Sequence, residues 1–271
     1  MNMVDFLKHS FSTPKKAEPV KKRKKVGIAF GGGGLKGTAH VGMLKVFAEY
    51  NIPIDMVAGT SIGSAIAALY GAGYDWQMMK KLFEGLDIES LIKIHPTRRG
   101  LIPATGYTEM LRLCTKGLRI EELRIPVKIV AVDLISRKKI IFSSGDTATA
   151  VRASSAIPGV FTPVIMGDMV LVDGYVLDNC PGGVVRDMGA DVVIACNLAA
   201  PRTDMPANML DVVERSLDIA ASAYQKIDAD IILEPIEQYM DSLDVNGMRE
   251  CYERGMKCAY EHIDEILELI K

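Results

Sequence analysis

The sequence predicts a three-layer α/β/α fold in which helices cover both faces of a mainly parallel sheet. Short apolar runs alternate with helix-like segments along the first half of the chain, and the links between them are short. Such an alternation requires crossover connections, which place neighbouring strands parallel. At 271 residues, of which 49% are apolar and 24% charged, the chain is long enough to bury a core without disulfides or metals.

The first predicted strand is Val26–Phe30, an apolar run that leads into consecutive glycines. A helix over about 37–50 follows, and then a second strand at Ile54–Ala58 leads into a helix that ends near Gly73. Asp75 is a residue type that favours the N-cap position, so another helix is expected to begin there. Strand, helix, strand and helix in this order favour a parallel sheet.

The middle of the chain continues the same pattern. Asp146 is expected to cap a helix that must stop before Pro158, because the residue before a proline disfavours helix. Residues 95–106 form the longest link without a pattern and are a candidate substrate-side loop. Four further strands are expected at Pro126–Asp133, Lys139–Phe142, Met169–Val172 and Asp191–Cys196.

Two late helices are marked by apolar residues at steps of three and four, and both stripes are expected to face the core. The first stripe consists of Leu210, Val213, Leu217, Ala220, Tyr224 and Ile227. The second consists of Val245, Met248, Tyr252, Met256, Ala259, Ile263, Ile266 and Ile270. We expect one domain over residues 26–271, with its motifs in 26–198 and its C-terminal helices in 207–270.

Charge is distributed unevenly along the chain. Residues 1–25 hold eight Lys or Arg against two acidic residues, a charge of +6, whereas the whole chain has a formal charge of -2. This composition favours a flexible, solvated basic tail, and transient contact with an anionic membrane is the alternative. The overall charge gives no argument for a nucleic-acid partner.

The cysteines and the N-terminal composition bear on the compartment. Five cysteines without a C-x-x-C pair indicate reduced thiols and no zinc site, and the basic stretch has no apolar segment with a cleavage site behind it. We therefore expect a cytoplasmic protein, with peripheral membrane contact as the alternative, and the sequence leaves the oligomeric state open.

The pattern G-x-S-x-G at Gly59–Gly63 is typical of a nucleophile elbow. Its glycines leave room for a sharp turn between a strand and a helix, and Ser61 would lie at the N-terminus of that helix. The helix dipole favours the negatively charged form of a serine at this position. Ser61 is therefore the candidate nucleophile.

A second glycine cluster, Gly31–Gly37, leads into the first helix and could hold a phosphate or an oxyanion on its backbone N–H groups. A Walker A loop is excluded because no Gly-Lys-Ser/Thr follows at the required offset. The spacing of Gly32, Gly34 and Gly37 matches a dinucleotide fingerprint, which requires an acid at the end of the second strand. Asp55 lies at the start of that strand, so we favour the oxyanion hole.

A serine nucleophile needs a base, and Asp173 is the best candidate. The apolar run before Asp173 ends in Asp-Gly, which places a carboxylate at the end of a strand. We expect the four histidines to be surface or packing residues, with one of them in the 95–106 link as a substrate-loop contact. They are His9, His40, His95 and His262.

Together these motifs resemble the patatin-like phospholipases. Gly32–Gly37, Gly59–Gly63 and Asp173-Gly174 stand in the order of that family, and Ala153–Pro163 is similar to its stretch before the acid. The resemblance runs from about residue 26 to residue 198. It departs at Tyr175, where the family usually has Gly or Ala, so a large side chain is expected to narrow the pocket or shift the aspartate.

The resemblance implies a patatin-like fold and a Ser–Asp dyad without histidine, metal or cofactor, acting on a lipid or fatty-acyl ester. Ser61 would form the acyl-enzyme and Asp173 would be the general base, in a dry site that raises its pKa from about 3.9. Gly32, Gly33 and Gly34 would form the oxyanion hole. The remaining motif residues are Lys36, Gly37, Gly59, Gly63 and Gly174.

Three alternatives remain beside this expectation. An acyltransferase would use the same dyad, a nucleotide-binding protein would use the Gly32–Gly37 loop, and a regulatory protein would have lost activity through Tyr175. Lys36 is expected either to neutralise a lipid headgroup or to be a solvated lysine at a helix start. Asp178 and Asn179 are expected to be turn and support residues.

Overall fold

A computed structural model of the chain describes residues 23–87, 97, 100–102, 105–200, 203–206, 209–238, 240 and 244–271. Its strands are β1 (Val26–Phe30), β2 (Met56–Thr60), β3 (Val127–Asp133), β4 (Lys138–Phe142), β5 (Val164–Met166), β6 (Met169–Asp173), β7 (Val192–Cys196) and β8 (Ile231–Leu233). Its α-helices are α2 (Thr38–Glu49), α3 (Ile62–Gly71), α4 (Trp76–Glu84), α6 (Thr105–Cys114), α7 (Thr147–Ser154), α8 (Gly182–Asp187), α9 (Met209–Tyr224), α10 (Met248–Glu261) and α11 (Ile263–Ile270). Short 3-10 turns are η1 (Gly34–Gly37), η2 (Ile120–Glu122) and η3 (Gly174–Val176).

The strands form one sheet in the order β5-β6-β3-β2-β1-β7-β8, with β4 paired to β3. The strands from β3 through β2, β1 and β7 to β8 pair in parallel, whereas β4, β5 and β6 join by antiparallel pairing. The predicted mainly parallel sheet is thus confirmed, with an antiparallel side added. The carboxyl ends of β1 and β2 lie side by side, which brings the two glycine clusters together.

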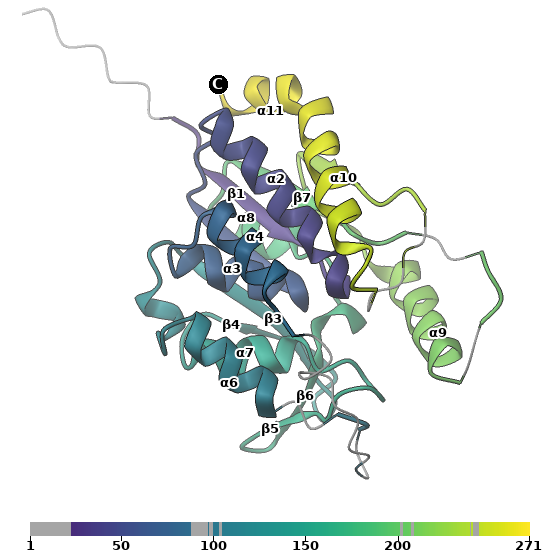
Figure 1. Ribbon diagram of the computed structural model, residues 1–271. Helices are drawn as coiled ribbons and strands as arrows, with labels where there is room; N and C mark the ends of the chain where they lie inside the picture. The colour runs from purple at the N-terminus through teal and green to yellow at the C-terminus, as the bar shows by residue number, and fades with distance from the viewer. Residues whose placement is uncertain are drawn as a thin grey trace, which may run out of the picture.

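Helices lie on both faces of this sheet (Figure 1). Buried side chains form a separate core on each face. Because side chains alternate along a strand, Ile28 and Phe30 of β1 pack into the larger core with α2 and α3, while Ala29 packs with Val184 and Val185 of α8. The three-layer α/β/α prediction is therefore confirmed. Within the described residues, no helix combines the length and the apolar character needed to cross a bilayer.

Most predicted elements are present, with shifted ends. Strand β1 has the predicted bounds, and Asp75 and Asp146 cap α4 and α7 by accepting the backbone N–H groups of Met78 and Thr149. Strand β2 begins two residues later than predicted and continues to Thr60, directly before Ser61. The sequence did not indicate β5, β8, α6 or α8, which are short or lack a clear apolar period.

The two late apolar stripes have different outcomes. The second packs as predicted at Ala259, Ile263 and Ile266, which are buried, but Val245 is exposed before α10 and the helix breaks at His262 into α10 and α11. The first prediction was wrong for α9, because Val213 and Ala220 are exposed. Helix α9 lies apart from α2 and α10 at the side of the molecule (Figure 1), where few elements can cover it.

Candidate active site

Ser61 lies in a strained turn between β2 and α3. Its backbone has φ 54° and ψ −127°, a left-handed φ that side chains other than glycine rarely adopt. The turn brings backbone segments very close together on both sides of Ser61, which is possible only where a side chain is absent. A Cβ atom on Gly59 would lie 2.2 Å from the Gly63 carbonyl oxygen, and one on Gly63 would lie 2.1 Å from the Phe30 carbonyl oxygen. Only glycine fits either position, as expected of a nucleophile elbow.

The hydroxyl of Ser61 points to Asp173. Its Oγ donates a hydrogen bond of 2.6 Å to Asp173 Oδ2 across the ends of β2 and β6, and both side chains are buried. The strand β3 lies between them in the sheet, and Ala131 of β3 is paired with Asp173. The two residues that the sequence singled out, 112 positions apart, are therefore in direct contact.

Asp173 has an unusual environment for a carboxylate. Its side chain is 1% exposed, and its other oxygen, Oδ1, accepts a 3.0 Å hydrogen bond from the backbone N–H of Tyr175. Burial raises the pKa of Asp173 to about 7, although the hydrogen bonds from Ser61 and Tyr175 act in the opposite direction. A carboxyl group with a pKa near neutrality is a better proton acceptor than an ordinary aspartate.

Ser154, at the end of α7, binds the backbone of the turn at Ser61. The sequence analysis did not single out this residue. Its Oγ accepts a 2.9 Å hydrogen bond from the backbone N–H of Ser61 and donates one of 2.5 Å to the Val130 carbonyl. Thr60 adds a second tie, since its hydroxyl donates to the Asp178 carbonyl at 2.8 Å. Ser154 belongs to the stretch Ala153–Pro163, whose similarity to the family was the one feature of the sequence that could have indicated its role.

The glycine loop lies beside Ser61, and a Cβ atom on Gly32 would come within 3.1 Å of Ser61 Cβ. The backbone N–H of Gly32 donates to the Asn179 carbonyl at 3.0 Å, so that group already has an acceptor. The N–H groups of Gly33 and Gly34 donate to no acceptor within the described part of the chain. These two amides are the ones suited to an oxyanion.

His40 supports the glycine loop and is not placed to act as a base. Its ring is fully buried, and Nε2 lies 2.8 Å from the Gly31 carbonyl oxygen. Because a carbonyl only accepts, Nε2 carries the hydrogen. Burial lowers the pKa of His40 to about 4, so the ring is neutral at pH 7. His262 lies at the α10–α11 junction with Nδ1 2.8 Å from the Cys258 carbonyl oxygen, while His9 and His95 lie outside the described residues.

The structure bears on three expectations about residues around the site, namely those for Lys36, Tyr175 and Asp55. Lys36 is buried and donates to the Leu198 carbonyl at 3.2 Å, so it is not the solvated lysine expected as one alternative. Tyr175 does not line the cavity beside Ser61 and therefore does not narrow it. Asp55 accepts hydrogen bonds from Arg23 and from the Val26 backbone N–H, which weakens the dinucleotide-binding alternative further.

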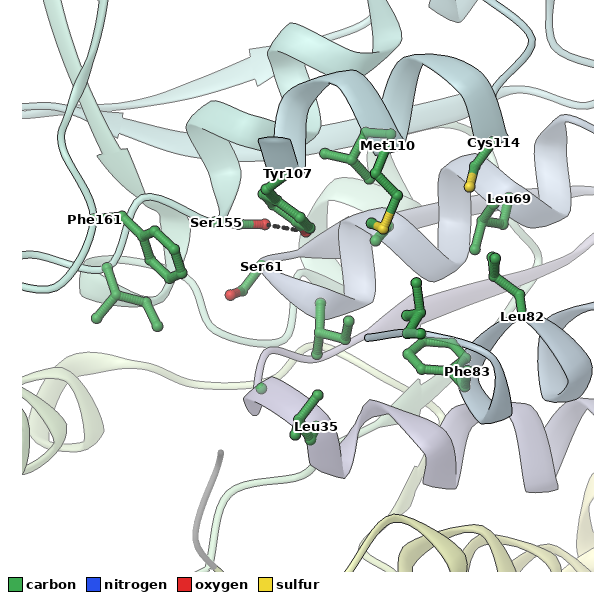
Figure 2. Close-up of a pocket in the computed structure, with 16 residues that line it drawn as sticks. Leu35, Ser61, Leu69, Leu82, Phe83, Tyr107, Met110, Cys114, Ser155 and Phe161 are labelled. Carbon is green, nitrogen blue, oxygen red and sulfur yellow. Dashed lines mark hydrogen bonds between the residues drawn. The ribbon is translucent and has the colours of Figure 1, made fainter. Parts of the chain in front are cut away.

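A cavity of about 130 Å³ adjoins Ser61. Figure 2 shows Ser61 between Phe161 on one side and a group of apolar side chains from α3, α4 and α6 on the other. Tyr107 and Ser155 are polar members of the wall, and their hydroxyl oxygens lie 3.4 Å apart. An apolar cavity that is lined in part by a buried serine suits an apolar chain attached to a reacting carbonyl group.

Comparison with known proteins identifies relatives over about two thirds of this chain. An uncharacterised NTE family protein of Mycobacterium tuberculosis is 31% identical over 191 residues, covering 68% of this chain and 53% of that protein. Lysophospholipase NTE1 of Yarrowia lipolytica is 32% identical over 195 residues, covering 69% of this chain and 14% of the yeast protein. The chain thus spans about half of the mycobacterial relative and a small part of the yeast one.

The fold is also similar to a solved structure. VipD from Legionella pneumophila has a TM-score of 0.65 with 16% sequence identity, over 92% of this chain and 67% of that one. The Patatin family, described as patatin-like phospholipase, matches residues 28–185, which include both glycine clusters, Ser61 and Asp173. The chain belongs to the patatin-like phospholipase family.

Proposed function

We propose that this chain is a serine hydrolase that cleaves carboxylic esters of lipids through Ser61 and Asp173. The observation that carries the proposal is the 2.6 Å hydrogen bond from Ser61 Oγ to a buried carboxylate, beside an apolar cavity. Family membership and the name of the yeast relative, a lysophospholipase, support a lipid ester as the substrate class.

In the proposed reaction, Ser61 Oγ attacks the ester carbonyl carbon while its proton moves to Asp173 Oδ2. The carbonyl oxygen becomes an oxyanion that the backbone N–H groups of Gly33 and Gly34 stabilise. Collapse of this intermediate breaks the carbon–oxygen bond, and Asp173 gives its proton to the departing alcohol. Water then attacks the acyl-enzyme with Asp173 again as the base, and the fatty acid leaves Ser61.

The nucleophile can be tested with a fluorophosphonate probe read by intact mass. We expect one probe per chain in the wild type and none in Ser61→Ala, because only an activated serine reacts readily. Ser155→Ala is the matched control, since Ser155 lines the same cavity without contacting Asp173, and it should still be labelled. Labelling of Ser61→Ala, or none of the wild type, would refute the proposal.

Contact of the basic tail with an anionic membrane is a second, separable part of the proposal. The basic residues of segment 1–22 supply a favourable electrostatic free energy of roughly 1 kcal/mol each near such a surface. A deletion of residues 1–22 keeps Arg23, whose guanidinium pairs with Asp55 at 2.6 Å. Flotation with vesicles that contain phosphatidylserine should show weaker binding of the truncated chain at low salt. Equal binding would rule out this role.

A further inference from the structure

One face of α3 runs along the cavity from Ser61 inward. Ser61, Ala65 and Leu69 all line the cavity, and their spacing of four residues places them on the same side of the helix. Because an α-helix rises 1.5 Å per residue, Ala65 lies about 6 Å and Leu69 about 12 Å from Ser61 along the axis. We call these three residues the acyl face of α3.

The far part of the cavity is apolar. Leu82 and Phe83 of α4 and Cys114 of α6 line it near Leu69, and Figure 2 shows them on the side of Ser61 that faces away from Phe161. Burial raises the pKa of the Cys114 thiol, so this group is uncharged and adds no polar partner. A charged headgroup would find no polar or oppositely charged partner there, whereas a hydrocarbon chain needs no such partner.

The size of the cavity limits what it can hold. Its volume is about 130 Å³, and a dry protein cavity of roughly 150 Å³ holds a single benzene molecule. Two acyl chains are therefore too large. The distance of about 12 Å to Leu69 would fit roughly ten bonds of one extended hydrocarbon chain, so the volume sets the tighter limit on chain length.

We propose that the acyl face of α3 selects a single acyl chain of roughly six to eight carbon atoms, and that Ala65 and Leu69 determine this length. The inference rests on the proposed role of Ser61, because the chain must be attached to the carbonyl that Ser61 attacks. The small side chain of Ala65 leaves the passage open, and Leu69 narrows its far end. The alcohol part of the ester then stays on the outer side of Ser61.

The proposal predicts how rate depends on chain length. Each methylene that enters the cavity raises kcat/KM about fourfold, from the transfer free energy of a buried methylene. In a series of p-nitrophenyl esters, kcat/KM should rise from a two-carbon to an eight-carbon chain and should not rise further for a sixteen-carbon chain. Continued growth to sixteen carbons, or no dependence on length, would overturn it.

Two substitutions test the residues through the ratio of kcat/KM for the eight-carbon ester to that for the two-carbon ester. Ala65→Phe fills the passage about 6 Å from Ser61, so the ratio should fall roughly 250-fold because about four methylenes no longer fit in the cavity. Leu69→Ala opens the far end and should move the optimum to longer chains. An unchanged ratio in Ala65→Phe and an unmoved optimum in Leu69→Ala would each contradict the assignment.

Matched controls make the same changes away from the cavity. Ala220→Phe on α9 and Leu113→Ala on α6 alter exposed side chains, Leu113 being 78% exposed, and should leave the ratio unchanged. Labelling by a small fluorophosphonate reports whether each variant is folded, and Ala65→Val and Leu69→Val replace any variant that is not. If the small probe fails on the wild type, the proposed function is wrong; if it labels Ser61 and the ratios do not move, only the acyl face is wrong.

Discussion

Asp173 and Asp133 are neighbours on two paired strands, yet their carboxyl groups differ strongly in acidity. In the antiparallel pair of β6 and β3, Asp173 lies opposite Ala131 and Asp133 lies opposite Leu171. Their side chains are 1% and 3% exposed. Nevertheless the pKa of Asp173 is raised to about 7, whereas that of Asp133 is lowered to about 2.

The hydrogen-bond donors around Asp133 explain its low pKa. The hydroxyl of Ser136 has the largest effect, and the backbone N–H groups of Ser136, Val170 and Ile135 also donate to the carboxylate and outweigh desolvation. Each donor stabilises the charged form. Asp133 therefore acts as a fixed anion that holds the β3–β4 turn against β6.

Asp173 has fewer donors and a more complete loss of water. It accepts from the Ser61 hydroxyl and from the Tyr175 backbone N–H, and desolvation dominates. The comparison teaches that the pKa of a carboxyl group at this edge of the sheet depends on two things together, the loss of water around the carboxyl and the number of donors that it accepts from. Surplus donors at Asp173 would fix its negative charge and remove its affinity for the serine proton.

The largest expected effect is on the rate after Asp173→Asn. The amide cannot take the proton of Ser61, so kcat/KM for a soluble ester should fall by about 10²- to 10⁴-fold, the usual range for a lost general base. Steady-state kinetics on purified protein measures this, with His262→Ala as the control expected to change little. If His262→Ala were as damaging without unfolding, a histidine-based triad would be the better mechanism.

The same substitution should stabilise the protein at alkaline pH. The folded pKa of about 7 is above the unfolded value of about 3.9, so the wild type loses stability as the pH rises from about 4 through 7. The uncharged Asp173→Asn variant avoids this loss, and its free energy of unfolding at pH 8 should be higher by up to about 4 kcal/mol. Urea unfolding at pH 8 and pH 4 measures the difference, which should vanish at pH 4. A variant that is less stable at both pH values would contradict the raised pKa.

The pH profile of activity tests the ionisation of Asp173 directly. General-base action needs the charged form, so kcat/KM should fall about tenfold per pH unit below roughly 7 and level off above it. Rates of fluorophosphonate labelling should follow the same curve, because they depend on the same base. A profile that stays flat down to about pH 5 would show that Asp173 ionises like an ordinary aspartate.

Sequence reasoning found Ser61 and Asp173 because each lies in a local motif that requires a particular backbone shape. The positive φ of Ser61 needs the glycines around it, and those glycines are visible in the sequence. Ser154 escaped notice because its role depends on α7 packing behind the elbow, a contact between segments 93 residues apart. Such contacts leave no local pattern.

The apolar stripes show the same limit for the fold. The period of α10 and of α9 predicts an apolar face equally well in both, but burial depends on what lies opposite. Helix α10 packs along α2, where Gly255 closely approaches the Ala39 backbone, whereas Val213 of α9 remains exposed. The sheet order and the antiparallel side formed by β4, β5 and β6 were equally out of reach, because strand pairing is set by distant segments.

The smallest expected effect on catalysis is that of Asp133→Asn. Asp133 contacts neither Ser61 nor Asp173, so kcat/KM per folded molecule should change by less than about threefold. Stability should respond instead, because the variant loses the charge to which the backbone N–H groups donate. The lowered pKa gives the wild type an advantage that is complete above about pH 4 and is lost as the pH falls toward 2. Thermal unfolding at pH 7 should show a lower Tm for the variant, and the gap should narrow in acid. A large loss of activity at full stability would mean that Asp133 and Asp173 act together, which would contradict a purely structural role for Asp133.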